Sequence, residues 1–167
     1  MKVIDSMNVM PTIDLFDSNA VIVEQLARVM AKTCPNAFSL VITNPVNSLV
    51  PVIAEVLKSE NVFNPQRLFG VTTLDVIRAS SFSAEAFPSA VDTNIVVPVV
   101  GGHSNKTIVP LFSQSSPNLV GVDEAALASL STRVQLAGDE VIRAKNGTGS
   151  ATLCMAYAGY KSLTFCT

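Results

Sequence analysis

The sequence contains no tryptophan, a single histidine and few charged residues, and these shortages narrow the classes of protein it can belong to. Only 14% of its 167 residues are charged, and 11 basic against 13 acidic side chains give a formal net charge of −2. No basic stripe follows the chain, so we expect no nucleic-acid partner. No apolar run approaches the roughly 18 residues that cross a bilayer, so we expect no membrane partner either.

Cysteine is scarce as well. The three cysteines, Cys34, Cys154 and Cys166, are odd in number and scattered, which argues against a disulfide framework or a zinc site. Near the amino terminus, Asp5 stands where a secretory signal would need an apolar stretch. These features predict an intracellular, reducing environment, unpaired structural thiols and no metal. They leave open a mitochondrial, peroxisomal or cytoplasmic location.

Hydrophobic residues, by contrast, are abundant. They make up 49% of the chain, a content typical of strands that are buried on both faces, as in parallel α/β sheets. The length suits one domain or parts of two, and an incomplete fold would show the same composition.

Alternating periodicities in the first 71 residues predict helices and strands in turn. Residues 15–32 form a helix with one apolar face, and residues 38–43 a short buried strand. A second helix follows, capped by Asn47 or Ser48 and with Pro51 in its first turn, and residues 67–71 form another strand. This order predicts right-handed βαβ units and a mostly parallel sheet. The apolar faces consist of Ile22, Leu26, Val29 and Met30 in the first helix, and of Leu49, Val52, Ile53, Val56 and Leu57 in the second.

The remaining sequence predicts a different arrangement, with a boundary near Gly70. Residues 73–85 form a helix, 84–93 a loop, and 94–100 and 107–112 two strands of a hairpin in which Pro110 imposes an edge or a bulge. Residues 123–145 form a long amphipathic helix, followed by a loop and a last helix that Ser150 caps. The long helix has its apolar stripe at Leu127, Leu130, Val134, Ala137 and Val141.

The one histidine lies in a setting suited to proton transfer. His103 follows Gly101 and Gly102, which allow backbone to pass close to a ligand. Histidine can deliver or accept a proton near neutral pH, and Asp75 can hold its ring in one tautomer. Arg78, three residues after Asp75, offers a planar fork that matches a carboxylate. The alternatives are a purely structural histidine and a solvated helix face for Arg78.

A further polar residue, Asn44, ends the strand at 38–43, at the sheet edge where open α/β folds bind ligands, although it can also be a plain turn residue. Four segments in order, 44–47 (NPVN), 71–79 (VTTLDVIRA), 99–107 (VVGGHSNKT) and 149–159 (GSATLCMAYAG), resemble the lactate/malate dehydrogenase family in its NAD-dependent mitochondrial and bacterial malate branch. The resemblance extends from about Asp14 to Tyr160.

The resemblance implies an enzyme of the tricarboxylic acid cycle that transfers hydride reversibly between NAD and malate or oxaloacetate. It makes His103 the acid/base, Asp75 its orienting partner and Arg78 the clamp for a substrate carboxylate, while Asn44 contacts both substrate and nicotinamide. It also implies a homo-oligomer. The cofactor positions are Asn19, Ile42, Thr43, Asn44 and Met155, although core packing is an open alternative for Met155.

For the fold, the resemblance implies an α/β chain: the second half of a doubly wound, Rossmann-type parallel sheet followed by the start of an α/β substrate domain. Residues 1–70 are then a partial dinucleotide-binding domain that lacks the first half, and residues 71–167 a partial substrate and catalytic domain.

The sequence departs from this family in two places. It contains no GxGxxG fingerprint, and no acidic residue about 20 positions after one to bind the ribose. Thr12 stands where the family has its second substrate-loop arginine, and no arginine precedes Arg28. We therefore expect a malate dehydrogenase truncated at both ends, with impaired activity and no dicarboxylate specificity from that loop. The alternative is a non-catalytic remnant or interaction fragment.

Overall fold

A computed structural model describes residues 12–88, 94–119 and 121–164 of the chain. These residues group into two compact units, one within Met1–Val71 and Ser162–Thr167 and the other within Thr72–Lys161. The stretch before Thr12, where the family carries its substrate-loop arginines, lies outside the described residues, as do residues 89–93 of the expected loop.

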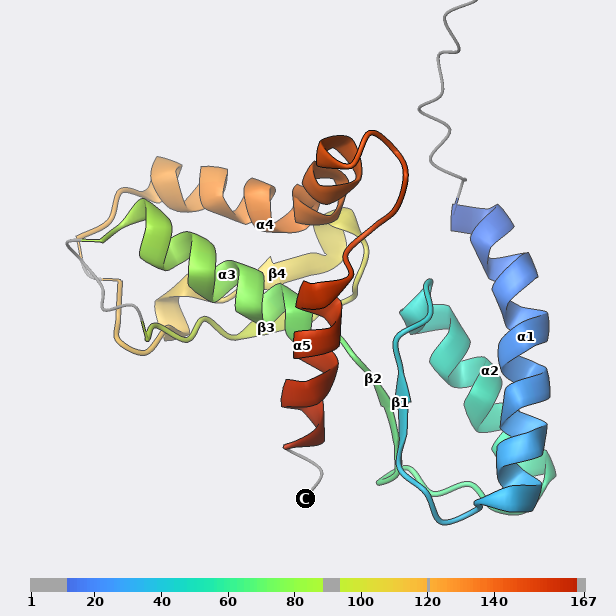
Figure 1. The fold of residues 1–167 in the computed structure, drawn as a ribbon. Helices are drawn as coiled ribbons and strands as arrows, with labels where there is room; N and C mark the ends of the chain where they lie inside the picture. The colour runs from blue at the N-terminus through green and yellow to red at the C-terminus, as the bar shows by residue number, and fades with distance from the viewer. Residues whose placement is uncertain (1–11, 89–93, 120, 165–167) are drawn as a thin grey trace, which may run out of the picture. The chain divides into compact units, whose positions relative to one another are not determined.

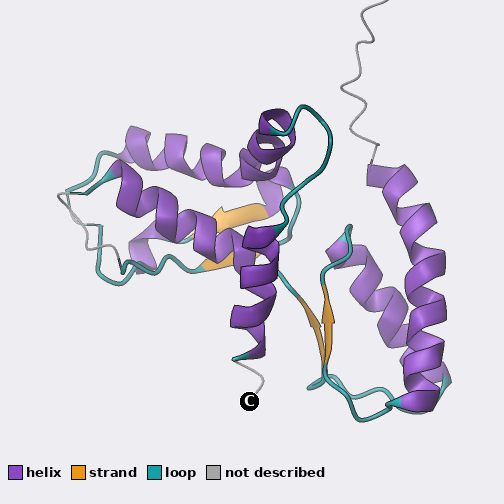
Figure 2. Ribbon diagram, in the orientation of Figure 1, coloured by secondary structure: helices purple, strands orange, loops and turns teal. Residues whose placement is uncertain are grey.

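The first unit is a parallel βαβ arrangement with one additional helix. It consists of α1 (Thr12–Thr33), β1 (Ser39–Val41), α2 (Val46–Ser59) and β2 (Leu68–Gly70). β1 and β2 are parallel and pair Ser39 with Leu68 and Val41 with Gly70. Figures 1 and 2 show the two strands side by side and α1 alongside α2. The helix α2 contacts α1 and both strands. The predicted parallel pair is therefore confirmed.

The helix α1 buries a different face from the predicted one. Its core side chains are small: Val23, Ala27 and Ala31 are buried, at four-residue spacing. Ile22 and Leu26, by contrast, are 54% and 62% exposed. The prediction failed because size alone does not select the packed face: small residues let two helices approach closely, and the contact side chains set the interhelical distance. Val29 is exposed too, and of the predicted stripe Met30 packs against the core.

The helix α2 buries the predicted apolar face but begins earlier than predicted. Its buried residues include Leu49, Ile53, Val56 and Leu57, and Val52 packs beside them. The cap is Pro45, not Asn47 or Ser48, because the backbone amides of Ser48 and Leu49 both donate to the Pro45 carbonyl at 3.0 Å. Pro51 consequently lies inside the helix, past its first turn. An ion pair from Arg28 to Glu60, at 3.0 Å, also joins α1 to α2.

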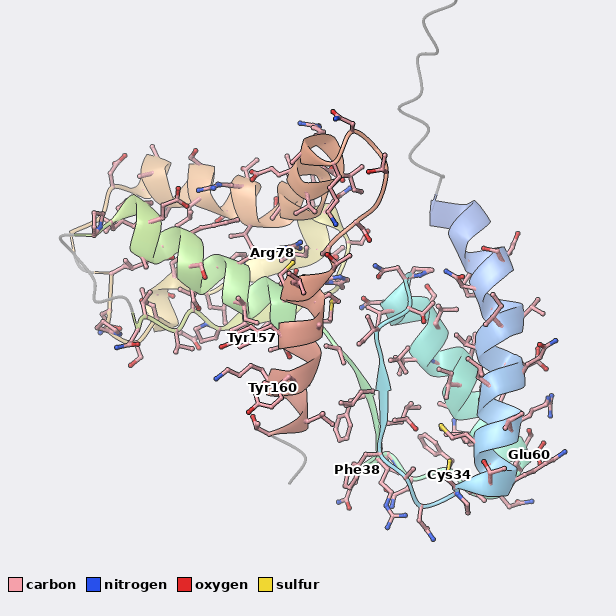
Figure 3. The ribbon with its side chains drawn as sticks, viewed as in Figure 1. Cys34, Phe38, Glu60, Arg78, Tyr157 and Tyr160 are labelled. Carbon is pink, nitrogen blue, oxygen red and sulfur yellow. The ribbon has the colours of Figure 1, made fainter. Side chains whose placement is uncertain are left out.

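The strand β1 is less buried than predicted. Val41 is buried, but Phe38 and Ile42, at its two ends, are 51% and 44% exposed. Within the described part of the chain, β1 pairs with β2 alone, so one edge carries no strand partner. Phe38 stacks on Phe69 of β2, with ring centroids 6.5 Å apart, and is labelled in Figure 3.

The second unit packs helices against an antiparallel hairpin. Its elements are α3 (Thr73–Ala86), β3 (Val99–Gly101), η1 (Asn105–Thr107), β4 (Ile108–Pro110), η2 (Phe112–Gln114), α4 (Glu124–Ala144) and α5 (Leu153–Leu163). β3 pairs with β4, so the predicted hairpin is confirmed, but both strands are shorter than the predicted ranges 94–100 and 107–112. Both α3 and α4 contact the hairpin. The core consists of Ala79, Ile95, Val97, Ile108, Phe112, Leu130 and Val134.

The helix α4 follows its prediction closely. Asp123 caps it by accepting a hydrogen bond from the Ala126 amide, and Leu130, Val134 and Ala137 are buried along the predicted stripe. The cap expected for the last helix was wrong. α5 begins at Leu153, and the carbonyl of Ser150 instead accepts a hydrogen bond from Lys145 Nζ at 2.6 Å, which draws Ser150 back toward the end of α4.

Among the described residues, the cysteines are unpaired, and neither a group of metal ligands nor a membrane span occurs. Cys34 and Cys154 are exposed free thiols, and Cys166 lies outside the described part. No group of three or more potential metal ligands occurs among residues 12–88, 94–119 and 121–164. None of the helices in those ranges combines the length and apolar character that a membrane span requires.

Candidate active site

The predicted acid–base residues come together in the second unit. Asp75 lies in the first turn of α3 and is only 1% exposed, and Arg78 follows three residues later on the same helix face. His103 comes from the loop between β3 and η1. Figure 3 labels Arg78, which extends from α3.

The contact between His103 and Asp75 is the shortest polar contact of the site. His103 Nδ1 lies 2.5 Å from Asp75 Oδ2, and the histidine side chain is 16% exposed. An ionised carboxylate can only accept, so Nδ1 carries the hydrogen and the imidazole is held in one tautomer. Nδ1 is therefore the ring nitrogen engaged with the carboxylate.

The carboxylate of Asp75 also faces Arg78. Asp75 Oδ1 is buried without a hydrogen-bond partner among the described residues, and Arg78 Nη1 lies 3.9 Å from it. This separation is too long for a hydrogen bond but close enough for the cation to stabilise a buried anion. Arg78 is itself 13% exposed, and its contact with Asp75 uses none of its N–H donors in a hydrogen bond. It can therefore offer a bidentate pair to a second anion.

The glycines before His103 serve the backbone of the loop. Gly101 has a φ of +89°, and a Cβ at this position would lie 2.2 Å from the Thr107 carbonyl oxygen. The Gly102 amide donates to that same oxygen at 2.9 Å. We expected the glycines to allow close approach of a ligand; at Gly101 the close approach is instead to Thr107.

Residues expected to contact the cofactor lie in both units. In the first, the side-chain amide of Asn19 on α1 donates to the Asn44 carbonyl at 2.7 Å, a link that sequence reasoning missed. Ile42, Thr43 and Asn44, which follow β1, are all exposed. Met155 is half-buried on α5, in the second unit.

An apolar groove of about 370 Å³ adjoins the first of these groups. Leu26 and Met30 of α1 line one side, and residues 38–43 line the other. Ile42 and Thr43 are therefore both cofactor candidates and part of a surface hollow.

Comparison with known proteins identifies the class. Residues 9–70 match the model of the lactate/malate dehydrogenase NAD binding domain, and residues 72–166 match that of the lactate/malate dehydrogenase alpha/beta C-terminal domain. The chain belongs to the lactate/malate dehydrogenase family.

Individual relatives narrow the comparison to the malate branch. The mitochondrial malate dehydrogenase of Rattus norvegicus is 51% identical over 146 residues, which are 87% of this chain and 43% of the rat enzyme. The chain thus spans less than half the length of this relative. The resemblance inferred from the four segments is confirmed.

Solved structures agree on the α/β fold. Malate dehydrogenase of Cryptosporidium parvum superposes with a TM-score of 0.80 at 26% identity, over 92% of this chain and 50% of that one. Lactate dehydrogenase of the same organism, complexed with lactic acid and NAD, also gives a TM-score of 0.80, at 27% identity and over 90% and 48% of the two chains. The fold prediction is confirmed, and the fold by itself does not separate malate from lactate enzymes.

Proposed function

We propose that this chain carries the acid–base centre of an NAD-dependent malate dehydrogenase, which interconverts malate and oxaloacetate. The observation that carries the proposal is the 2.5 Å contact between His103 Nδ1 and the buried carboxylate of Asp75. The match to an NAD binding domain and the identity to a malate enzyme support the cofactor and the substrate. Residues 1–70 then form the dinucleotide-binding part and residues 71–167 the substrate and catalytic part.

His103 performs the proton transfer. In the reduction, Nε2 of the imidazolium donates its proton to the carbonyl oxygen of oxaloacetate as hydride reaches the carbonyl carbon. In the oxidation, neutral Nε2 takes the hydroxyl proton of malate as hydride leaves. Asp75 stabilises the imidazolium in both directions because its buried carboxylate keeps the opposite charge beside the ring.

Arg78 binds the substrate carboxylate next to the reacting carbon. Its guanidinium makes no hydrogen bond to Asp75, so its planar fork can pair with a carboxylate through two parallel hydrogen bonds. When His103 is protonated, two cations face the reacting end of an anionic substrate, and Asp75 neutralises one of these two charges.

Asn44 orients the reactants at the nicotinamide end, with Asn19, Ile42, Thr43 and Met155 as further cofactor contacts. When bound, the cofactor would supply the hydride acceptor as NAD in the oxidation and the hydride donor as NADH in the reduction. The exposed amide of Asn44 suits a carboxamide or a carbonyl, and Asn19 fixes the backbone that carries it. The residues fit the nicotinamide end only, because the sequence has no GxGxxG turn for the pyrophosphate.

The whole protein is proposed to act inside the cell as a homo-oligomer. The rat relative is mitochondrial, which favours that compartment over a peroxisomal or cytoplasmic one.

A second candidate is a non-catalytic interaction fragment. The observation that favours it is the exposed apolar face of α1, formed by Ile22, Leu26 and Val29. Such a face is typical of a contact surface. An activity assay separates the two candidates, because only the enzyme requires His103.

The test uses a chimera, since the chain covers 43% of the rat enzyme. The matching segment of the rat enzyme is replaced by the corresponding 146 residues of this chain, and malate-dependent NAD reduction is measured. The His103→Asn variant should lower kcat by about 100-fold or more, the usual scale for an acid/base group. Asp75→Asn should lower it as well, through the loss of the correct tautomer.

A matched control is Asp139→Asn, on the half-exposed middle of α4, which should leave turnover unchanged. Near-normal malate oxidation by the His103→Asn chimera would contradict the assignment. An inactive but folded parent chimera would favour the interaction fragment.

A further inference from the structure

The loop that carries His103 is closed by hydrogen bonds that converge on Thr107. Thr107 Oγ1 accepts from the Ser104 amide at 3.1 Å and donates to the Ser104 carbonyl at 2.7 Å. The Thr107 amide also donates to that carbonyl, at 2.9 Å, and the Gly102 amide donates to the Thr107 carbonyl at 2.9 Å. Both chain neighbours of His103 are therefore tied to one residue.

Thr107 is in turn anchored to the core of the second unit. The next residue, Ile108, is 5% exposed, begins β4, and accepts a hydrogen bond on its carbonyl from Gln135 Nε2 of α4 at 3.0 Å. On the opposite strand, Gly101 gives the Thr107 carbonyl room that a side chain would take. The anchor is therefore tied to the buried core, while the loop that it holds is mostly exposed.

The position of His103 depends on this anchor. Asp75 is held in a helix and is buried, so a displacement of the histidine backbone would move the ring away from the 2.5 Å contact. A displacement of about 1 Å takes such a pair out of hydrogen-bond range. It would also leave both oxygens of a buried carboxylate without a hydrogen-bond partner, because Oδ1 already has none among the described residues.

We propose that Thr107 is a positioning residue that holds His103 against Asp75 through its hydroxyl group and its carbonyl. Its relevance to turnover rests on the proposed function. The contact between His103 and Asp75 can be measured without substrate or cofactor, and hence independently of turnover.

The test uses NMR on the full chain, whose only histidine makes the imidazole Nδ1–H signal unambiguous. Thr107→Val keeps the side-chain shape and removes the hydroxyl, whereas Thr107→Ser keeps the hydroxyl. Thr132→Val is the matched control, because Thr132 Oγ1 likewise donates to a backbone carbonyl, that of Ala128 in α4, at 3.1 Å.

We expect solvent exchange of the His103 Nδ1–H proton to accelerate on the order of tenfold in Thr107→Val, the scale for loss of one or two hydrogen bonds. Thr107→Ser and Thr132→Val should retain the wild-type rate. A wild-type rate in Thr107→Val, or equal acceleration in the serine and valine variants, would overturn the proposal.

If Thr107→Val does not fold, a measurement on the unmodified chain tests the proposal instead. The Ser104 amide and the His103 Nδ1–H should lose exchange protection together as urea is raised, because one local opening exposes both. Protection of the His103 proton that outlasts that of the Ser104 amide would refute the coupling. Neither result depends on malate turnover, so an inactive chimera would count against the proposed function alone.

Discussion

Asp75 is the residue that both His103 and Arg78 contact. It is almost fully buried, and a buried carboxylate is retained only where cations or hydrogen bonds compensate for the lost hydration. His103 provides one hydrogen bond and Arg78 one charge. The two partners differ in geometry, and this difference is the basis for proposing proton transfer by the histidine and anion binding by the arginine.

Arg78→Lys tests this division of roles. In the rat chimera it should raise the KM for oxaloacetate by roughly tenfold to 100-fold, because a lysine cannot reproduce a bidentate carboxylate pair worth about 1.5–3 kcal/mol. NADH binding should remain nearly intact. Steady-state kinetics and an NADH titration measure the two effects.

Arg143→Lys, on the exposed last turn of α4, is the matched control and should change neither quantity. Equal damage to oxaloacetate and NADH binding in Arg78→Lys would show that Arg78 is structural.

At the scale of secondary-structure elements, the β3–β4 hairpin requires a glycine at the end of β3 and carries His103 in the loop that follows. Gly101 is the last residue of β3 and has a left-handed backbone conformation, and the Thr107 carbonyl fills the space beside it. The same pair of residues therefore ends the strand and supports the histidine.

Gly101→Ala should consequently destabilise the second unit, by about 1–3 kcal/mol, the usual cost of a strained backbone conformation. Gly138→Ala is the matched control: Gly138 lies in α4, and a Cβ there meets nothing within 4 Å. It should stabilise the chain by roughly 0.5–1 kcal/mol, since alanine is favoured over glycine in a helix. Urea denaturation of both variants measures the difference, and equal midpoints would contradict the steric account.

At the scale of the whole molecule, the 167-residue chain should not bind NADH usefully without a complementary segment. The sequence contains no glycine-rich turn for the pyrophosphate. Contacts at the nicotinamide end alone offer too little surface to offset the lost translational and rotational freedom of the ligand. Titration calorimetry should show no saturable signal at micromolar NADH.

A dissociation constant in the low micromolar range, or malate-dependent NAD reduction by the 167-residue chain, would contradict this expectation. The rat enzyme in the same assay is the positive control.

The same chain should also self-associate. The edge of β1 that has no strand partner among the described residues and the exposed apolar residues of α1 favour contacts between copies. Size-exclusion chromatography should therefore show a species larger than the 17.6 kDa monomer. Elution as a monomer at all concentrations would contradict the expectation.

The order of the α-helices and strands and the placement of Asp75 and Arg78 on one helix face could be predicted from the sequence alone, whereas η1 and η2 could not. These features depend on short-range periodicity: three residues along a helix bring two side chains to one face, and a cap such as Asp123 acts within its own turn. The four ordered segments also identified the family, because each combines several residues at fixed spacing.

Three features could not be predicted without the fold: the buried face of α1, the start of α2 and the hydrogen bonds around His103. α1 is apolar on more than one side, and its packing against α2 selected Val23, Ala27 and Ala31 over the larger Ile22 and Leu26. The hydrogen bonds of Thr107 could not be predicted either, because they involve backbone groups whose partners depend on the path of the chain. Side-chain chemistry can be recognised from spacing, whereas packing partners and backbone hydrogen bonds depend on residues brought together by the fold.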